Sequence, residues 1–121
     1  MSPELITAME SAIERLESWK GREVAVEEAI SRAVGKSFGY DRHFCTRSRF
    51  VFAVEFVGWT ISGSAVTVDG SQGGHQAGYQ LTLDRVIAAE LPEDGSVAFT
   101  ERFGEVAERR SVFRLVATPN Q

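Results

Sequence analysis

The chain has 121 residues, the usual size of one domain, and we expect residues 1–121 to form a single domain around one core. Hydrophobic residues make up 43% and charged residues 25%, which excludes disorder of the whole chain, and no apolar run is long enough to span a bilayer. The net charge of −4 argues against a general nucleic-acid binder, a single cysteine excludes an internal disulfide, and the acidic N-terminus does not resemble a signal peptide, so we expect a cytoplasmic protein.

Residues 3–20 are predicted to form an amphipathic helix. Ser2 is a suitable N-cap, Pro3 fits the first helical position because its missing N–H has no intrahelical partner there, and Gly21 favours the helix end. Apolar residues recur at three- and four-residue spacing and form one stripe: Leu5, Met9, Ala12, Ile13 and Leu16. We expect this stripe to pack against the rest of the domain.

Residues 22–34 fit two interpretations. Val24 and Val26 alternate as they would in a strand. Helical spacing, with Gly35 as a plausible cap, is found in a larger set: Val26, Ala29, Ile30, Ala33 and Val34. We predict a second helix that begins near Val24, with a strand as the alternative.

From residue 49 onward the hydrophobic period changes to two, which is typical of strands. Residues 49–57 predict a central strand covered on both sides, with one face formed by Phe50, Phe52, Val54 and Phe56. Four further strands are predicted at 59–68, 79–91, 96–103 and 110–118, with turn-rich connections between them. The sequence therefore predicts an α+β fold, with an N-terminal helix, or two helices, packed on a curved five-stranded antiparallel sheet or small open barrel.

Two stretches resemble small β-barrel domains. "WKGREVAV" (19–26), after an N-terminal helix, resembles the opening of Sm-like barrels, and "YQLTLDRVIAAEL" (79–91) resembles a strand of WYL-type regulatory domains. The Trp-Tyr-Leu signature of the second family is absent from the sequence. The resemblance implies a curved sheet or open barrel and assigns no functional residue.

Charge is unevenly distributed along the chain. Residues 1–28 contain seven glutamates against three basic residues, whereas residues 36–49 contain four basic residues against one aspartate. In 36–49 the basic residues alternate with aromatic ones, a composition enriched where proteins contact partners or bind anionic groups. With the histidine of the glycine-rich loop at 69–78, this segment supplies the predicted binding residues: Tyr40, Arg42, His43, Phe44, Arg47, Arg49 and His75.

The same segment contains side chains suited to other chemistry. Asp41, His43 and Cys45 alternate, and His75 could join them in a zinc site. Cys45 with His43 or His75 as its base could instead be the nucleophile of a hydrolase or transferase. Neither a thiol-enzyme signature nor paired metal-ligand spacing accompanies these residues, and the glycines at 70–78 lack the following helix of a phosphate-binding loop.

We therefore expect a small non-enzymatic binding domain that contacts a protein partner or a small anionic ligand through residues 36–49 and the adjacent glycine-rich loop. Its acidic composition fits an inhibitor or regulatory protein of a cellular or phage system, and the acidic helix offers a surface for homo-oligomer formation. We predict no cofactor and no catalytic residue. The alternative is a small hydrolase or transferase, or a zinc-binding protein, at Cys45, His43 and His75.

Overall fold

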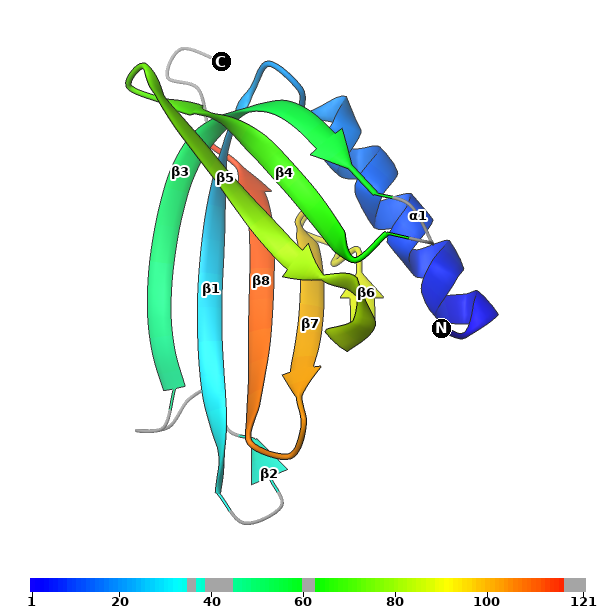
Figure 1. Ribbon diagram of the computed structural model, residues 1–121. Helices are drawn as coiled ribbons and strands as arrows, with labels where there is room; N and C mark the ends of the chain where they lie inside the picture. The colour runs from blue at the N-terminus through cyan, green and yellow to red at the C-terminus, as the bar shows by residue number, and fades with distance from the viewer. Residues whose placement is uncertain (35–36, 39–44, 60–62, 117–121) are drawn as a thin grey trace.

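One N-terminal helix packs on a curled antiparallel sheet in the computed structural model, which describes residues 1–34, 37–38, 45–59 and 63–116 (Figure 1). The fold is α+β, as the sequence predicted, and the sheet has the form of a half-barrel. Among the described residues, no helix is both long and apolar enough to cross a membrane.

The predicted helix is confirmed as α1 (Pro3–Ser18). The Ser2 hydroxyl accepts a hydrogen bond from the Leu5 N–H at 3.1 Å, which satisfies one of the backbone donors left unpaired at a helix start. Gly21 has a φ of +83°, a conformation that suits glycine just after a helix. The buried face of α1 is the predicted stripe without Leu5, which is half-buried: Met9, Ala12, Ile13 and Leu16.

Seven strands follow one another across the sheet in the order β5-β4-β3-β1-β8-β7-β6, and the short β2 pairs with β1 alone. The strands are β1 (Glu23–Val34), β2 (Ser37–Phe38), β3 (Cys45–Gly58), β4 (Ala65–Gln72), β5 (His75–Thr82), β6 (Val86–Glu90), β7 (Val97–Phe103) and β8 (Ala107–Leu115). The edge strands β5 and β6 are joined by one 3₁₀ turn, η1 (Leu83–Arg85), so the sheet must curl back toward itself.

The second predicted helix is wrong, because residues 23–34 form β1 in the middle of the sheet. Val24 and Val26 lie on the inner face in the core, while the outer face carries the small residues Ala25 and Ala29. Apolar residues on both faces of a central strand can match helical spacing by chance. Pairing with β3 on one side and β8 on the other decides the strand conformation.

A β-bulge changes the predicted orientation of side chains in β3. Phe52 and Val54 are buried in the core, but the pairing with β4 shifts between Val54 and Phe56. After the shift Val57 is in the core and the Phe56 side chain is 55% exposed, since the extra residue reverses the alternation. The prediction that Phe56 shares the buried face is therefore wrong.

Residues 79–91 do not form one strand. The end of β5 leads into η1, and the alternation resumes out of phase in β6, where Val86 is buried and Ile87 is 46% exposed. Residues 69–78, predicted as a connection, contain the paired ends of β4 and β5 around a two-residue Gly73–Gly74 turn. Both glycines have positive φ, as type I′ hairpin turns require. The division of 79–91 into β5 and β6, together with β1, accounts for seven strands across the sheet in place of five.

The core lies inside the curl of the sheet, and α1 covers it along β6 with further contacts to β3 and β7. Tyr79 marks its boundary, because its ring packs edge-on against the buried Phe113 and tilted against Phe50, which is 44% exposed. The inner face beyond Tyr79 carries polar side chains.

Candidate anion-binding face

Alternation along β1 separates two environments. Val24, Val26 and Glu28 point to the inner face, and Glu27 and Ala29 point to the outer face, away from the core. Cross-strand partners share a face, so the register of β1 with β3 and β8 determines which side chains meet on each side.

On the outer face, Ala29 lies between two arginines. It pairs with Arg47 of β3 on one side and with Arg110 of β8 on the other. Adjacent strands are about 4.8 Å apart, so the backbones of these arginines are separated by roughly 10 Å across the small alanine. In the next row, Glu27 pairs with Arg49.

A depression of about 370 Å³ forms over this part of β1. It is lined by Glu27, Glu28, Ala29, Arg47, Ser48, Arg49, Arg110 and Val112. Three arginines against two glutamates make it locally basic in a chain whose net charge is −4. Within the part of the chain that the structure describes, neither Arg49 nor Arg110 has a carboxylate at ion-pair distance. Among the described residues, these two arginines are thus not neutralised by an ion pair.

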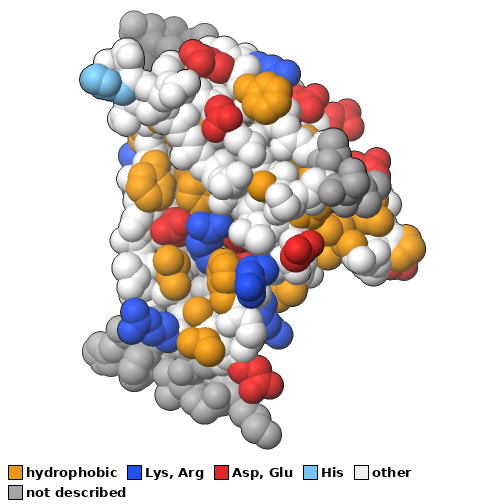
Figure 2. Space-filling model, viewed as in Figure 1, with side chains coloured by type: hydrophobic (Ala, Val, Ile, Leu, Met, Phe, Trp, Pro, Cys, Tyr) orange, Lys and Arg blue, Asp and Glu red, His pale blue; other side chains and the backbone are white. Residues whose placement is uncertain are grey.

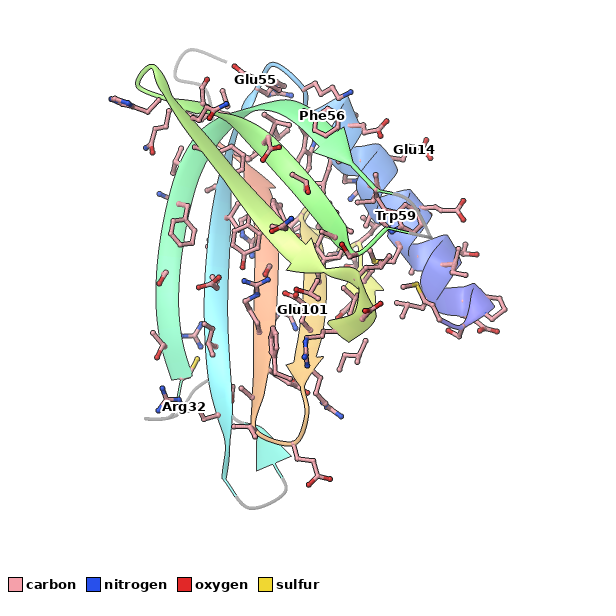
Figure 3. The ribbon with its side chains drawn as sticks, viewed as in Figure 1. Glu14, Arg32, Glu55, Phe56, Trp59 and Glu101 are labelled. Carbon is pink, nitrogen blue, oxygen red and sulfur yellow. The ribbon has the colours of Figure 1, made fainter. Side chains whose placement is uncertain are left out.

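The inner face holds a different charged group, centred on Arg109. Its guanidinium donates to the Glu101 carboxylate at 2.7 Å and lies 3.5 Å from Glu28. The Tyr79 hydroxyl is 2.7 Å from both the Glu28 carboxylate and the Ser111 hydroxyl. Figure 3 shows Glu101 on β7 beside the end of β5, with the polar side chains of β8 next to it.

Burial dominates the electrostatics of this inner group. It raises the pKa of Tyr79 well above its usual range, and the hydrogen bond to Glu28 adds to the rise while that to Ser111 opposes it. Burial, the largest single influence, would lower the pKa of Arg109, but the hydrogen bond to Glu101 and the charges of Tyr79, Glu101 and Glu28 together outweigh it, so the pKa is raised. Arg109 is therefore charged and paired at any physiological pH.

The inner group also supplies partners for two backbone groups near the end of edge strand β5. The Thr82 N–H donates to Glu101 at 2.8 Å, and Arg109 donates to the Gln80 carbonyl at 2.8 Å. Side chains of β7 and β8 thus reach across the inside of the half-barrel to hold its free edge. In Figure 2, which looks onto the side crossed by β5, acidic and basic side chains accordingly lie close together in the middle of the molecule.

The predicted binding residues are only partly brought together. Arg47 and Arg49 lie on the outer face of β3, while Tyr40, Arg42, His43 and Phe44 lie outside the described residues. His75 is the first residue of β5, at the Gly73–Gly74 hairpin. Ser71 of that hairpin pairs with Ala53, so His75 lies roughly 20 Å along the sheet from Arg47. The glycine-rich loop is therefore not adjacent to the arginines.

Cys45 is also far from His75. Cys45 is the first residue of β3, near Arg47, whereas His75 lies at the hairpin. Its thiol is free and lies 4.0 Å from the carbonyl oxygen of Thr46. Asp41 and His43, the other predicted partners, are outside the described residues. Among the residues that are described, no three histidine, cysteine, aspartate or glutamate side chains group as metal ligands would.

Arg110 and Ala29 were not recognised from the sequence. They belong to β8 and β1, far from Arg47 and Arg49 in the chain, and only the register of three strands unites them. Strand alternation indicates that Arg110 and Val112 lie on the outer face, because Ser111 and Phe113 point inward. It does not indicate which residues of the neighbouring strands lie beside Arg110.

No protein-family model, curated protein or solved structure matches the chain. The segment at 79–91 that resembles one strand of WYL-type domains is divided between β5, η1 and β6.

Proposed function

We propose that this protein is a non-enzymatic binding domain that receives a carboxylate or phosphate group of its partner on the outer face, in the depression over Ala29. The observation that supports the proposal is the placement of Arg47 and Arg110 on either side of that small residue, with Arg49 in the next row. A protein carboxylate and a small anion share the chemistry that this depression would recognise.

Arginine is well suited to this role. Its planar guanidinium offers a fork of N–H donors that pairs with two oxygens of a carboxylate or phosphate, and such charge-assisted hydrogen bonds are stronger than neutral ones. Ala29 leaves room between the flanking arginines, so one anionic group can contact both. A longer side chain at this position would fill the depression.

The strands that carry these arginines favour binding further. β3, β1 and β8 are paired over nine residues on each side of β1, so their backbones are fixed before a partner arrives. Binding on a preformed surface loses less conformational entropy than binding on a loop. The remaining cost is the ordering of the arginine side chains.

Charge reversal tests the proposal. Arg49→Glu with Arg110→Glu is compared with Arg22→Glu with Arg32→Glu, which changes the net charge equally. Arg22 precedes β1, and Arg32 lies near the end of β1 (Figure 3), where strand alternation places it on the face opposite Ala29. The probes are hexaglutamate and tripolyphosphate, titrated into ¹⁵N-labelled protein. We expect amide shifts at Ala29 and Arg110 that weaken with salt, and a loss of affinity of about tenfold or more only in the Arg49 and Arg110 variant.

Equal losses in both variants, or no response to either probe, would contradict the proposal. Binding of hexaglutamate alone points to a protein partner, whereas binding of both probes shows that the depression also accepts small anions. Arg49→Gln with Arg110→Gln serves as the second variant if charge reversal unfolds the sheet, since neutral residues on an exposed face rarely disturb folding.

A further inference from the structure

The free edge of β5 has a predictable set of outward backbone groups. The hairpin closes on the pair Gln72 and His75, and in an antiparallel ladder every second pair exchanges hydrogen bonds. His75, Ala77 and Tyr79 therefore bond to β4, and the alternate residues turn their N–H and C=O groups away from it. The outward set is Gln76, Gly78, Gln80 and Thr82.

Half of this edge is capped inside the protein. The Gln80 carbonyl and the Thr82 N–H are the groups held by Arg109 and Glu101, which agrees with the outward set derived from the hairpin. Glu101 is fully buried to make this contact. Unpaired edge groups attract other strands, and natural sheets commonly cover them.

The other half of the edge is open. Gln76 and Gly78 are exposed, and among the described residues no side chain or backbone group bonds to their N–H or C=O groups. At the opposite edge of the sheet, α1 packs along β6. The stretch from Gln76 to Gly78 is thus a short uncovered template for one more strand.

A depression of about 370 Å³ lies beside this open stretch, on the outer face. Gly78 provides part of its floor, because a Cβ there would lie 2.5 Å from the Asp69 carboxylate. Phe56, turned outward by the bulge, and Glu55 form another part of its lining. Figure 3 shows Glu55 and Phe56 where β3 bends toward α1.

The lining selects a kind of side chain. Two carboxylates, Glu55 and Asp69, lie with a large exposed aromatic ring and no basic residue. A lysine or arginine gains from both features, through charge pairing and through its attraction to the face of a phenyl ring. An acidic side chain would be repelled.

We propose that an extended segment of a protein partner adds to β5 as one further strand of the curled sheet, pairing with Gln76 and Gly78 and placing a lysine or arginine in the depression at Phe56. Main-chain hydrogen bonds supply part of the affinity in this mode of recognition, and the pocket supplies specificity. The surface is separate from the arginines around Ala29, and neither proposal rests on the other.

A second copy of the chain is a poorer occupant of the same edge. Pairing of two β5 edges about a two-fold axis would place the same acidic depression on both sides of the junction, and like charges would face each other without a basic residue between them. A basic segment of a different protein meets no such repulsion.

The test compares two substitutions at one residue. Gln76→Pro removes an outward N–H without removing a bond to β4, and Gln76→Ala retains that N–H and serves as the matched control. The probe is the most enriched peptide from a displayed library of random linear nonapeptides selected against the full chain. We expect a basic residue in that peptide and a loss of affinity of about tenfold or more for Gln76→Pro alone.

Amide hydrogen exchange locates the added strand. On peptide binding, the N–H groups of Gln76 and Gly78 should slow markedly, while those of Ala77 and Tyr79, already bonded to β4, should change little. Glu55→Gln with Asp69→Asn should weaken binding by about fivefold to tenfold through the loss of charge pairing.

Four outcomes would overturn the proposal. No peptide is enriched, or the enriched peptide binds Gln76→Pro as well as it binds the parent chain, or the exchange protection falls on residues away from β5. Dimer formation that Gln76→Pro abolishes would assign the edge to a second copy and also overturn it. Circular dichroism tests whether each variant is folded. If Gln76→Pro does not fold, Phe56→Ser tests the pocket in its place.

Discussion

The two faces of β8 use consecutive arginines in opposite ways. Arg109 points inward, where its side chain is 20% exposed and contacts Glu101, Glu28 and the Gln80 carbonyl. Arg110 points outward beside Ala29, with no ion pair to another described residue. The alternation of a strand assigns one arginine to holding the half-barrel together and leaves the other available to a partner.

This difference has an energetic consequence. A buried charge must keep its partner, because removing one member of the pair leaves the other desolvated and uncompensated. Arg110 is half-buried but has no ion pair to another described residue, so its loss leaves no buried charge uncompensated and costs little stability. Stability and binding should therefore respond to substitutions on different faces.

Glu101→Ala should have the largest effect on folding. It leaves Arg109 without its closest carboxylate and the Thr82 N–H without an acceptor, so we expect the free energy of unfolding to fall by about 3–5 kcal/mol. Arg110→Ala should change it by less than about 0.5 kcal/mol. Urea unfolding followed by the fluorescence of Trp19 and Trp59 measures both.

The double variant Glu101→Leu with Arg109→Leu separates pairing from packing. Because it removes both charges, it should recover much of the stability that Glu101→Ala loses. A loss for Arg110→Ala as large as that for Glu101→Ala would show that the outer arginine is also structural, and the contrast between the faces would fail.

Tyr79→Phe should have an intermediate effect. It removes the hydrogen bonds to Glu28 and Ser111 while keeping the ring contacts with Phe50 and Phe113, so we expect a loss of about 1–3 kcal/mol near pH 7. Tyr79 is buried at the core boundary and one of its two bonds is to a carboxylate, but Arg109 still contacts Glu28 in the variant, so the loss stays below that of Glu101→Ala.

The same residue makes the inner face sensitive to alkaline pH. The pKa of Tyr79 is raised in the folded state, so the stabilisation by its neutral phenol is fully present below the ordinary tyrosine pKa of about 10 and declines as the pH rises above it. Unfolding curves between pH 8 and 11 should show a smaller alkaline decline for Tyr79→Phe than for the parent chain. Equal declines would assign the effect to other groups.

The sequence predicts the fold where one face of an element differs clearly from the other. The helix 3–20 has a single apolar stripe and proper caps, and α1 ends within two residues of that range. β1 lacks this contrast, since Ala25 and Ala29 face outward opposite Val24 and Val26, and its strand conformation comes from pairing with distant residues. The bulge at Val54 leaves no local signal either, because it depends on the register with β4.

The candidate site is also predictable only in part, because local sequence features identify some of its residues and strand pairing brings in the others. Arg47 and Arg49 belong to a segment whose composition is unusual, so composition alone singles them out. Arg110 has an ordinary sequence context and reaches Arg47 only across β1. The open edge of β5 is set by the hairpin register and by contacts from β7 and β8, neither of which can be read from residues 75–82.

Asp94→Asn should have the smallest effect and the opposite pH dependence. Asp94 lies in the turn before β7, where hydrogen bonds from Ser96 and then from Arg114 hold the pKa of its carboxyl below its usual range. Its contribution to stability is therefore present above the ordinary aspartate pKa of about 3.9 and is lost as the pH falls below it. Because the carboxyl is exposed, water and salt screen the interaction, and the variant should differ only slightly from the parent chain at pH 7 and in low salt. Unfolding between pH 2 and 7 measures this difference, and an acid decline unchanged in Asp94→Asn would show that other groups control stability on the acid side.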